Sequence, residues 1–502
     1  MKTRNPVLAL LALGLTFGAC SDESISPAGA SAADGRGGGR ILHTMSAHLP
    51  EDQREDAMAA LARDAFRREN RFLDAVKPGH LFQATRVDQA AIESGAWTND
   101  ELYRIGGQLF NFTFTKEVGY GGKDLPAYGR FQTGRRGGPD APRCATCHWR
   151  GGPAGSGDGA DNAYLDGDGS SQSSALARNP IALAGAGLVE IVAAEMSAEL
   201  AQVRLLLAKQ AEASGKATRG DLVAKGISFG KLTVKPDGSV EPGEISGVDA
   251  DLVVKPFGWK GNVATVRDAV EDELLLHHGM ESDHLVAEGK TERVGPFGGV
   301  DPDGDNVISE ITEGQVTALT LFVAMQEAPV EVTPVSSDET LLAAKGRALM
   351  KTLGCASCHV SSLPLSSTTF TLPSRGGGAA VKVDLAREGA DPRILPDLQS
   401  GAFRVFLFSD LKRHDVGKDL AEARADRGAP AAQFLTRPLW GVGRSRPYLH
   451  DARAALLEDA ILLHGGEAKE ARDAYEALAD VDRGAVRLLL TTLTRAPRLV
   501  TQ

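Results

Sequence analysis

The chain has 502 residues, of which 42% are hydrophobic and 24% are charged, and its formal net charge at pH 7 is −11. This length suits two or three globular domains, and the composition excludes a chain that is disordered throughout. The acidic balance argues against nucleic acid as a partner, because phosphate contacts need a surplus of Lys and Arg on at least one face.

The first residues have the pattern of an export signal. Lys2 and Arg4 precede an apolar run at 7–17 that is too short to span a membrane. Small residues then lead to Cys20, and a Ser-, Gly- and Ala-rich stretch follows. We predict a signal peptide at residues 1–20, either a plain signal or a lipoprotein signal in which Cys20 is lipidated. By resemblance to lipoprotein sorting, the expected location is the periplasm or outer membrane of a Gram-negative bacterium, with the lipid as the only membrane contact.

Helical periodicity and chain breaks divide the remainder into segments. Residues 21–96 are predicted as a tether and an N-terminal helical segment, with an amphipathic helix at 50–76. Residues 97–330 form the predicted first domain. A stretch rich in Pro, Ser and Val marks a linker at 331–340, and 341–502 form the predicted second domain.

Within the two domains most segments have helical periodicity, so we expect a mainly α fold. Residues 97–138 are rich in Gly, Phe and Tyr and favour loop. Residues 226–259 alternate and turn like a small β-hairpin insert in the first domain. Predicted helices cover 179–213, 263–278, 339–353 and two amphipathic segments of 454–493 that are separated near "HGGEA".

One short motif, Cys-x-x-Cys-His, occurs twice. At this spacing two thiols can form thioethers with the vinyl groups of a haem, while the adjacent histidine supplies an axial nitrogen to iron. We therefore predict two covalently bound haem c groups, one in each of two cytochrome c-like domains, with the histidines as proximal ligands. The residues are Cys144, Cys147 and His148 in the first motif and Cys355, Cys358 and His359 in the second.

Two other sites remain as weaker alternatives. A zinc site built from both pairs would join Cys147 to Cys355, which lie far beyond the usual spacing of zinc-binding pairs. A redox-active pair does not need the following histidine, and it usually lies at a strand-to-helix turn that the Gly-rich flank does not suggest.

The second axial position of each iron decides function, because a filled position favours electron transfer and an open one permits peroxide chemistry. Residues 267–279 resemble 453–465, and both segments end in His-Gly. This repeat selects His278 for the first iron and His464 for the second, although a solvated histidine at a helix end would also explain His464. His277 would point about 100° away from His278 on a helix. The alternatives for the first iron are Met280, Met196 and an open site.

Three further side chains are candidates for supporting the haems. His450 and His414 each precede an Asp, a pairing that can orient an imidazole, and each could instead be purely structural. Trp440 could lie between the haems, although core packing explains a large aromatic side chain equally well.

The segment "DPDGDNVISEITEG", residues 301–314, places carboxylates at alternate positions around a Gly. Such a loop can curve so that its oxygens converge on Ca²⁺. The predicted ligands are Asp301, Asp303 and Asp305, with Glu310 or Glu313 replacing the Glu that an EF-hand has at its twelfth position. The alternative is a plain acidic turn.

Several stretches resemble one bacterial family: "GRALMKTLGCASCHV", "FLFSDLKRHDVGKDLAE", "RPLWGVGRSRPYLHDARAALLEDAILLHGG" and "DPDGDNVISEITEGQVTALTLF". They are similar to the di-haem oxidoreductases, also called "thiol oxidoreductases", which are related to di-haem cytochrome c peroxidases and MauG. The resemblance runs roughly from Cys144 to the C-terminus and is densest in the last third. It implies that His464 occupies a ligand position where the peroxidases usually have Met. Val416 replaces the Met of the family's "HDMG", and no histidine after His148 matches the distal histidine of the peroxidases.

The sequence thus predicts an exported di-haem c-type oxidoreductase that transfers electrons between its haems and reduces a small oxidant such as hydrogen peroxide. Its expected partner is an electron-donor protein or a small redox carrier. An alternative is an electron-transfer cytochrome without its own catalysis, in which histidines saturate both irons. A third is a haem-bearing partner protein of a surface complex.

Overall fold

The computed structural model describes the chain from Pro78 to Arg495 with several gaps. The described residues are 78–121, 141–159, 176–291, 295–296, 299–388, 394, 396 and 401–495. The predicted signal peptide, Cys20 and the amphipathic helix at 50–76 lie outside these residues. All described residues fall within one compact unit, Glu55–Arg498.

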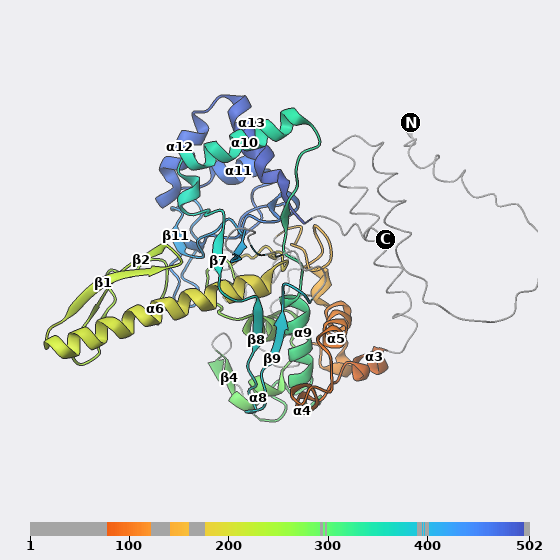
Figure 1. Cartoon of the computed structure of the whole chain (residues 1–502). Helices are drawn as coiled ribbons and strands as arrows, with labels where there is room; N and C mark the ends of the chain where they lie inside the picture. Colours follow the sequence, from red (N-terminus) through yellow and green to blue (C-terminus); the bar gives the residue numbers. More distant parts are fainter. Residues whose placement is uncertain are drawn as a thin grey trace, which may run out of the picture. The chain divides into compact units, whose positions relative to one another are not determined.

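Helices form the framework, and the sheets are small, in agreement with the predicted mainly α fold (Figure 1). None of the described helices is both long enough and apolar enough to cross a bilayer. The helices are α3 Pro78–Ala84, α4 Gln89–Glu93, α5 Asn99–Asn111, α6 Ala186–Ser214, α7 Val266–Glu273, the π-helix η5 Leu274–His278, α8 Asp283–Glu288, α9 Glu313–Ala324, α10 Ser337–Thr352, α11 Leu457–Leu462, α12 Lys469–Glu476 and α13 Asp480–Thr492.

Each strand in the described part of the chain pairs with antiparallel neighbours. The three-stranded sheet is β1 Thr218–Ala224, β2 Ile227–Val234 and β3 Val240–Glu241. The two-stranded pairs are β4 Lys290–Thr291 with β5 Gly295–Pro296, β6 Val330–Glu331 with β13 Leu493–Thr494, β7 Leu363–Leu365 with β10 Phe403–Val405, β8 Thr369–Leu372 with β9 Val381–Asp384, and β11 Arg413–Asp415 with β12 Gln433–Leu435.

Helix α5 differs from the loop that was expected over residues 97–138, of which 122–138 lie outside the described residues. Thr98 caps it through a hydrogen bond from the Glu101 backbone, and the Glu101 side chain accepts from the Thr98 backbone in return. The two adjacent glycines that suggested loop have a packing role instead. A Cβ atom at Gly106 would lie 2.1 Å from the carbonyl oxygen of Ala318 in α9, so glycine lets the two helices approach closely.

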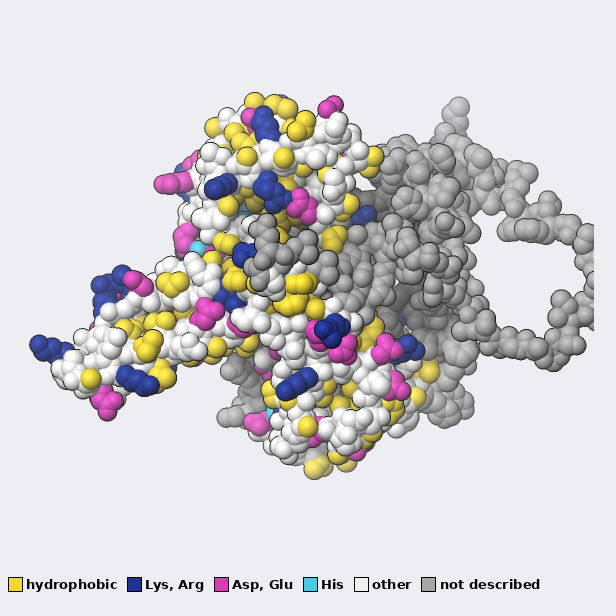
Figure 2. All heavy atoms as spheres, in the orientation of Figure 1, with side chains coloured by type: hydrophobic (Ala, Val, Ile, Leu, Met, Phe, Trp, Pro, Cys, Tyr) yellow, Lys and Arg dark blue, Asp and Glu magenta, His cyan; other side chains and the backbone are white. Residues whose placement is uncertain are grey.

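The predicted hairpin is present, but it begins earlier than residue 226, because β1 is its first strand. Lys225 and Gly226 at the turn both have positive φ values, 47° and 80°, as a two-residue hairpin turn requires. The buried side chains of Leu222 and Phe229 face the core. The hairpin runs beside α6, and Figure 2 shows hydrophobic and charged side chains intermingled over this part of the surface.

The main core combines residues from both predicted domains. Val189 of α6 and Phe322 of α9 belong to it, and so do Phe370, Leu372 and Val383 from the strands that follow the second Cys-x-x-Cys-His motif. In Figure 1 these strands, β8 and β9, lie beside α9. The chain after the linker therefore returns to complete the core of the first half.

A smaller core lies between α10 and α13. It contains Met350, Tyr475 and Leu489, and Gly346 allows α10 to approach the carbonyl oxygen of Ala485. The C-terminal region has three helices, α11, α12 and α13, where two were expected. Strand β6 lies at the start of the predicted linker and pairs with β13, which directly follows α13. The linker is therefore not only a spacer.

Candidate functional site

The second motif begins where α10 ends. Gly354, with φ 89°, turns the chain into the short helix Cys355–Ser357. His359 follows, and its Nδ1 atom lies 3.2 Å from the carbonyl oxygen of Phe408. Burial, assisted by the nearby His464, lowers the pKa of His359 to about 4, so its imidazole is neutral at physiological pH. With Nδ1 held by a carbonyl, Nε2 is the nitrogen that can bind a metal.

His464 lies just beyond the end of α11. Its Nδ1 atom is 2.7 Å from the carbonyl oxygen of Ala460, one turn earlier. Burial lowers the pKa of His464, so this imidazole is also neutral. The orientation again leaves Nε2 as the nitrogen available to a metal.

One cavity of about 460 Å³ brings the second motif and His464 together. Two thiols and two neutral imidazoles line it, and much of the remaining wall is apolar. Haem is a large, mostly apolar cofactor that needs these donors, so the residues present fit it. The lining includes Cys355, Cys358, His359 and His464, and apolar wall residues are Met350, Leu353, Leu439, Val442, Ile461 and Leu490.

The first motif has a similar local structure. Cys144 begins the short helix Cys144–Thr146, Cys147 caps its end, and His148 follows. The Nδ1 atom of His148 lies 3.2 Å from the carbonyl oxygen of Gly155 and 3.0 Å from that of Ile181. Burial lowers the pKa of His148. Its imidazole is therefore held in the same way as that of His359.

His278 lies against the first motif, although it belongs to η5. Its Nε2 atom is 3.4 Å from the Sγ atom of Cys144, and its Nδ1 atom is 2.6 Å from the carbonyl oxygen of Ala141. His277 turns elsewhere, with Nε2 2.7 Å from Oε2 of Glu273. The structure thus brings His278, rather than His277, to this motif. The other candidates lie buried in the main core: Met196 and Met280.

The cavity extends from the second motif toward the first. Arg150, Gly155 and Ile181, which follow or contact the first motif, also line it. Trp440 lies on the same wall and packs closely against Gly185: a Cβ atom at Gly185 would be only 2.5 Å from the Trp440 ring. Trp440 is therefore both part of the main core and part of the cavity wall between the two motifs.

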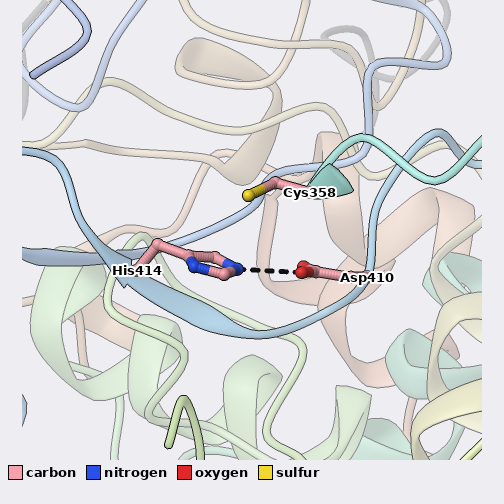
Figure 3. A group of neighbouring side chains, drawn as sticks. All are labelled: Cys358, Asp410 and His414. Atoms are coloured by element: carbon pink, nitrogen blue, oxygen red, sulfur yellow. Dashed lines mark hydrogen bonds and ion pairs between the residues drawn. The ribbon is translucent and has the colours of Figure 1, made fainter. Parts of the chain in front are cut away.

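His414 lies beside the second motif (Figure 3). Its Nε2 atom is 2.8 Å from a carboxylate oxygen of Asp410, and its Nδ1 atom is 2.8 Å from one of Glu467. Burial opposes protonation, but the hydrogen bonds to Asp410, Cys358 and Glu467 outweigh it and raise the pKa of His414 to about 11. The adjacent Asp415 is not its partner, contrary to the sequence-based expectation.

His450 is buried in an aromatic environment on the cavity wall. Its ring centroid is 4.5 Å from that of Phe434. Burial lowers the pKa of His450 to about 4. Its Nε2 atom is 3.9 Å from Asp451, which is beyond hydrogen-bond distance. Packing, rather than the adjacent Asp, therefore orients this ring.

Sequence reasoning missed two groups at this cavity. Arg437 lines it, and burial lowers the pKa of its guanidinium to about 10. Its contacts to the carbonyl oxygens of Pro256 and Gly258 are long, 3.3 and 3.5 Å. The second group is the carboxylate pair that holds His414. Arg437 contacts residues that are far away in the sequence. Glu467 is likewise distant from His414, whereas Asp410 lies only four residues before it.

The acidic loop folds as a turn in which Asp301, Asp303 and Asp305 bring carboxylate oxygens within 4.8 Å of one another. Glu310 approaches the same region, since it forms a second such group with Asp303. Glu313 does not, and its carboxylate is 3.3 Å from Arg375 instead.

Three comparisons relate the chain to known proteins. Residues 298–493 match the family model described as "Di-haem oxidoreductase, putative peroxidase". The match includes the second motif and His464 and begins after the first motif. A search of curated proteins found no significant match.

Among solved structures, the chain is similar to hydrazine synthase from Kuenenia stuttgartiensis pressurised with xenon, with 16% identity and a TM-score of 0.23. The alignment covers 37% of this chain and 57% of that chain, and a TM-score this low supports no inference. The family match is more informative, because it spans the second motif, the helix before it and the segment that carries His464. Over residues 298–493, the chain is similar to the di-haem oxidoreductase family.

Proposed function

We propose that the protein is an exported di-haem c-type oxidoreductase that reduces a small oxidant, with peroxide as the first substrate to test. One observation carries the proposal: a single cavity is lined by both thiols of the second motif, by His359 and by His464. The family match over the same region supports it.

The second motif would hold its haem through thioethers at Cys355 and Cys358, with His359 as the proximal ligand and His464 as the distal one. Bound haem would supply an iron that takes up and releases single electrons. The chain's own contribution is to present two neutral imidazoles whose Nδ1 atoms are already held by backbone carbonyls, which favours iron binding through Nε2.

The first motif would hold the other haem through Cys144 and Cys147, with His148 as the proximal ligand. His278 is the proposed distal ligand, because its Nε2 atom lies close to the Cys144 sulfur. We propose that the two motifs define two cytochrome c-like regions. Trp440, on the cavity wall between them, is proposed to assist electron transfer.

Positive charge on the cavity wall suits the propionate groups of a haem. The His414 imidazolium and the Arg437 guanidinium both line the cavity. Arg437 is the better candidate for a propionate contact, since its long contacts to carbonyl oxygens leave strong donors underused.

An electron-transfer cytochrome without its own catalysis is the second candidate. The placement of a histidine at each motif favours it, because two bis-histidine irons would have no open position for an oxidant. In either case the proposed partner is an electron-donor protein or a small redox carrier.

The proposed location is the periplasm or the outer membrane, with lipidation of Cys20 as the anchor. The proposed cofactors are two covalently bound haem c groups and a Ca²⁺ ion near Asp301, Asp303 and Asp305.

Absorption and EPR spectra of the purified full-length protein, with and without hydrogen peroxide, test the proposal. A haem spectrum that peroxide changes, with one axial histidine displaced from iron, would support the enzyme. Low-spin signals from both haems, unchanged by peroxide, would support the electron carrier. A chain whose intact mass includes no haem would overturn both.

A further inference from the structure

Three carboxylates meet in a buried cluster: two come from the acidic segment 301–314, and one comes from the chain that follows η5. Glu281 follows η5, Asp303 lies in the loop, and Glu310 lies just before α9. Each residue is at most 2% exposed, and one carboxylate oxygen of each lies within 4.8 Å of the others. Such a concentration of negative charge away from water is strongly unfavourable unless something neutralises it.

No side chain among the described residues supplies that neutralisation. One oxygen of each carboxylate, Oε1 of Glu281, Oδ2 of Asp303 and Oε1 of Glu310, is buried and has no hydrogen-bond partner there. Within the same part of the chain, none of the three forms an ion pair with Lys, Arg or His. Buried polar atoms are normally paired, so these three oxygens point to a missing ligand.

In two of the three carboxylates, the second oxygen accepts a hydrogen bond from the backbone. The backbone N–H of Glu281 donates to Oε2 of Glu310 over 2.5 Å, and the N–H of Asp305 donates to Oδ1 of Asp303 over 3.1 Å. These bonds hold the carboxylates of Glu310 and Asp303 so that the unpaired oxygen of each is the one left for a ligand. The arrangement is therefore built before any ligand arrives.

The loop adds two more carboxylates at the outer side. Asp301 and Asp305 form a second group with Asp303, again with oxygens within 4.8 Å. Both are less buried than Asp303. An all-oxygen set of this size suits Ca²⁺, which takes about 6–8 oxygen ligands in flexible geometry, better than Mg²⁺, which demands near-ideal octahedral geometry and keeps several waters.

The backbone encloses the cluster from another side. Gly119 has a φ of 104°, and a Cβ atom there would lie 2.2 Å from the Oε1 atom of Glu310. Only glycine can therefore occupy this position without displacing the carboxylate.

The pKa values of the three carboxylates agree with their buried, closely spaced arrangement. Burial, reinforced by the neighbouring carboxylates, raises the pKa of Glu281 to about 8 and that of Glu310 to about 10. Burial also raises the pKa of Asp303 to about 6. A bound divalent cation reverses such shifts, because it stabilises the ionised carboxylates.

We propose that Glu281, Asp303 and Glu310 bind one buried Ca²⁺ ion, and that Asp301 and Asp305 complete its coordination. The site extends the predicted loop to Glu281, a carboxylate that no loop motif includes. Its position also links it to the first motif, since Glu281 lies three residues after His278. The Ile311 N–H donates to the carbonyl oxygen of Glu281. Because Ile311 directly follows Glu310, an ion bound by Glu281 and Glu310 would hold both segments that make this contact.

The link to the first haem rests on the proposed function, whereas Ca²⁺ binding does not. The ion would hold the chain that leaves η5 and so keep His278 against the segment of Cys144. We therefore expect removal of Ca²⁺ to change the spectrum of the first haem more than that of the second.

The test uses purified full-length holoprotein. After gel filtration in chelator-free buffer, metal analysis should find about one Ca²⁺ per chain, and EGTA should lower the melting temperature in a way that added Ca²⁺ restores. Glu281→Gln and Asp303→Asn keep the side-chain shape but remove charge, and each should weaken Ca²⁺ binding by at least about tenfold. Asp237→Asn, in the exposed turn between β2 and β3, is the matched control and should bind Ca²⁺ as the wild type does.

Wild-type protein that retains no Ca²⁺ and melts at the same temperature in EGTA and in Ca²⁺ would overturn the site. Equal Ca²⁺ affinity in Glu281→Gln and wild type would also overturn it. The wild-type comparison stands even if a variant does not fold. Haem content and spin state, measured on the same samples, separate this result from a failure of the proposed function, because Ca²⁺ binding in a haem-free chain would contradict only the latter.

Discussion

The Nε2 atom of His278 lies 3.4 Å from the Sγ atom of Cys144, a residue 134 positions earlier in the chain. A second contact, from Nδ1 to the carbonyl oxygen of Ala141, ties the same ring to the segment that leads into the motif. The π-helix η5 thus delivers a histidine to a site that its own local sequence does not define.

Replacement of His278 by Gly should convert the first haem to a high-spin form, because the proposed distal ligand is lost. EPR and absorption spectra of the ferric protein measure this change. His277→Gly is the matched control, since its ring points to Glu273, and it should leave the spectrum as in wild type. An unchanged spectrum in His278→Gly would remove this residue from the ligand set.

Replacement of His464 by Ala should have the same effect on the second haem. The cavity would keep both thiols and His359, so haem attachment should persist while the low-spin signal of this haem disappears. The two haems are distinguished by comparison with His278→Gly. His284→Ala, a histidine paired with Glu271 away from both motifs, is the control. Loss of haem without a change in spin state would contradict the assignment.

Replacement of Gly106 by Ala should destabilise the protein by about 1–3 kcal/mol or more, because the new Cβ would collide with the backbone carbonyl of Ala318. Gly484→Ala in α13 is the matched control, since its nearest neighbour is the end of the Arg487 side chain at 4.0 Å. That change should be neutral or stabilise by up to about 1 kcal/mol through helix propensity. Chemical denaturation measures both, and equal effects would refute the close contact between α5 and α9.

His414 should make stability depend on pH. Its pKa is raised from 6.5 to about 11 in the folded protein, so the folded state holds the proton more tightly than the unfolded state. The stabilisation is fully present below about pH 6.5 and declines as the pH rises toward 11. The difference in unfolding free energy between wild type and His414→Gln should therefore shrink steadily over this range. A difference that grows with pH would contradict the ion pairs to Asp410 and Glu467.

Features encoded locally could be predicted from the sequence. The long helix α6 and helix α10 depend on patterns within a few turns of chain. Helix α10 lies within two residues of its predicted bounds, whereas α6 begins at residue 186 rather than 179. Helix α5 was missed because adjacent glycines lower helix propensity, and the reason for Gly106 is a contact with a distant helix. A sequence pattern holds no record of such a contact.

The candidate sites also contain some residues that a local pattern identifies and others that only the fold brings together. Asp301, Asp303 and Asp305 form a recognisable loop, whereas Glu281 joins them only through the fold. Glu467 likewise reaches His414 from a separate segment, 53 residues away in the sequence. Ligand sets assembled across the chain need a structure, because the sequence gives the residue types without their proximity.

The strands that follow the second motif fill the core of the first half with Phe370, Leu372 and Val383. A gene fragment that ended at the linker 331–340 would encode a first half lacking these side chains, and the remaining fragment would expose them to water. Recombination at that segment would thus give two products that each lack part of their hydrophobic core. The two halves must therefore be inherited together, despite their similar motifs.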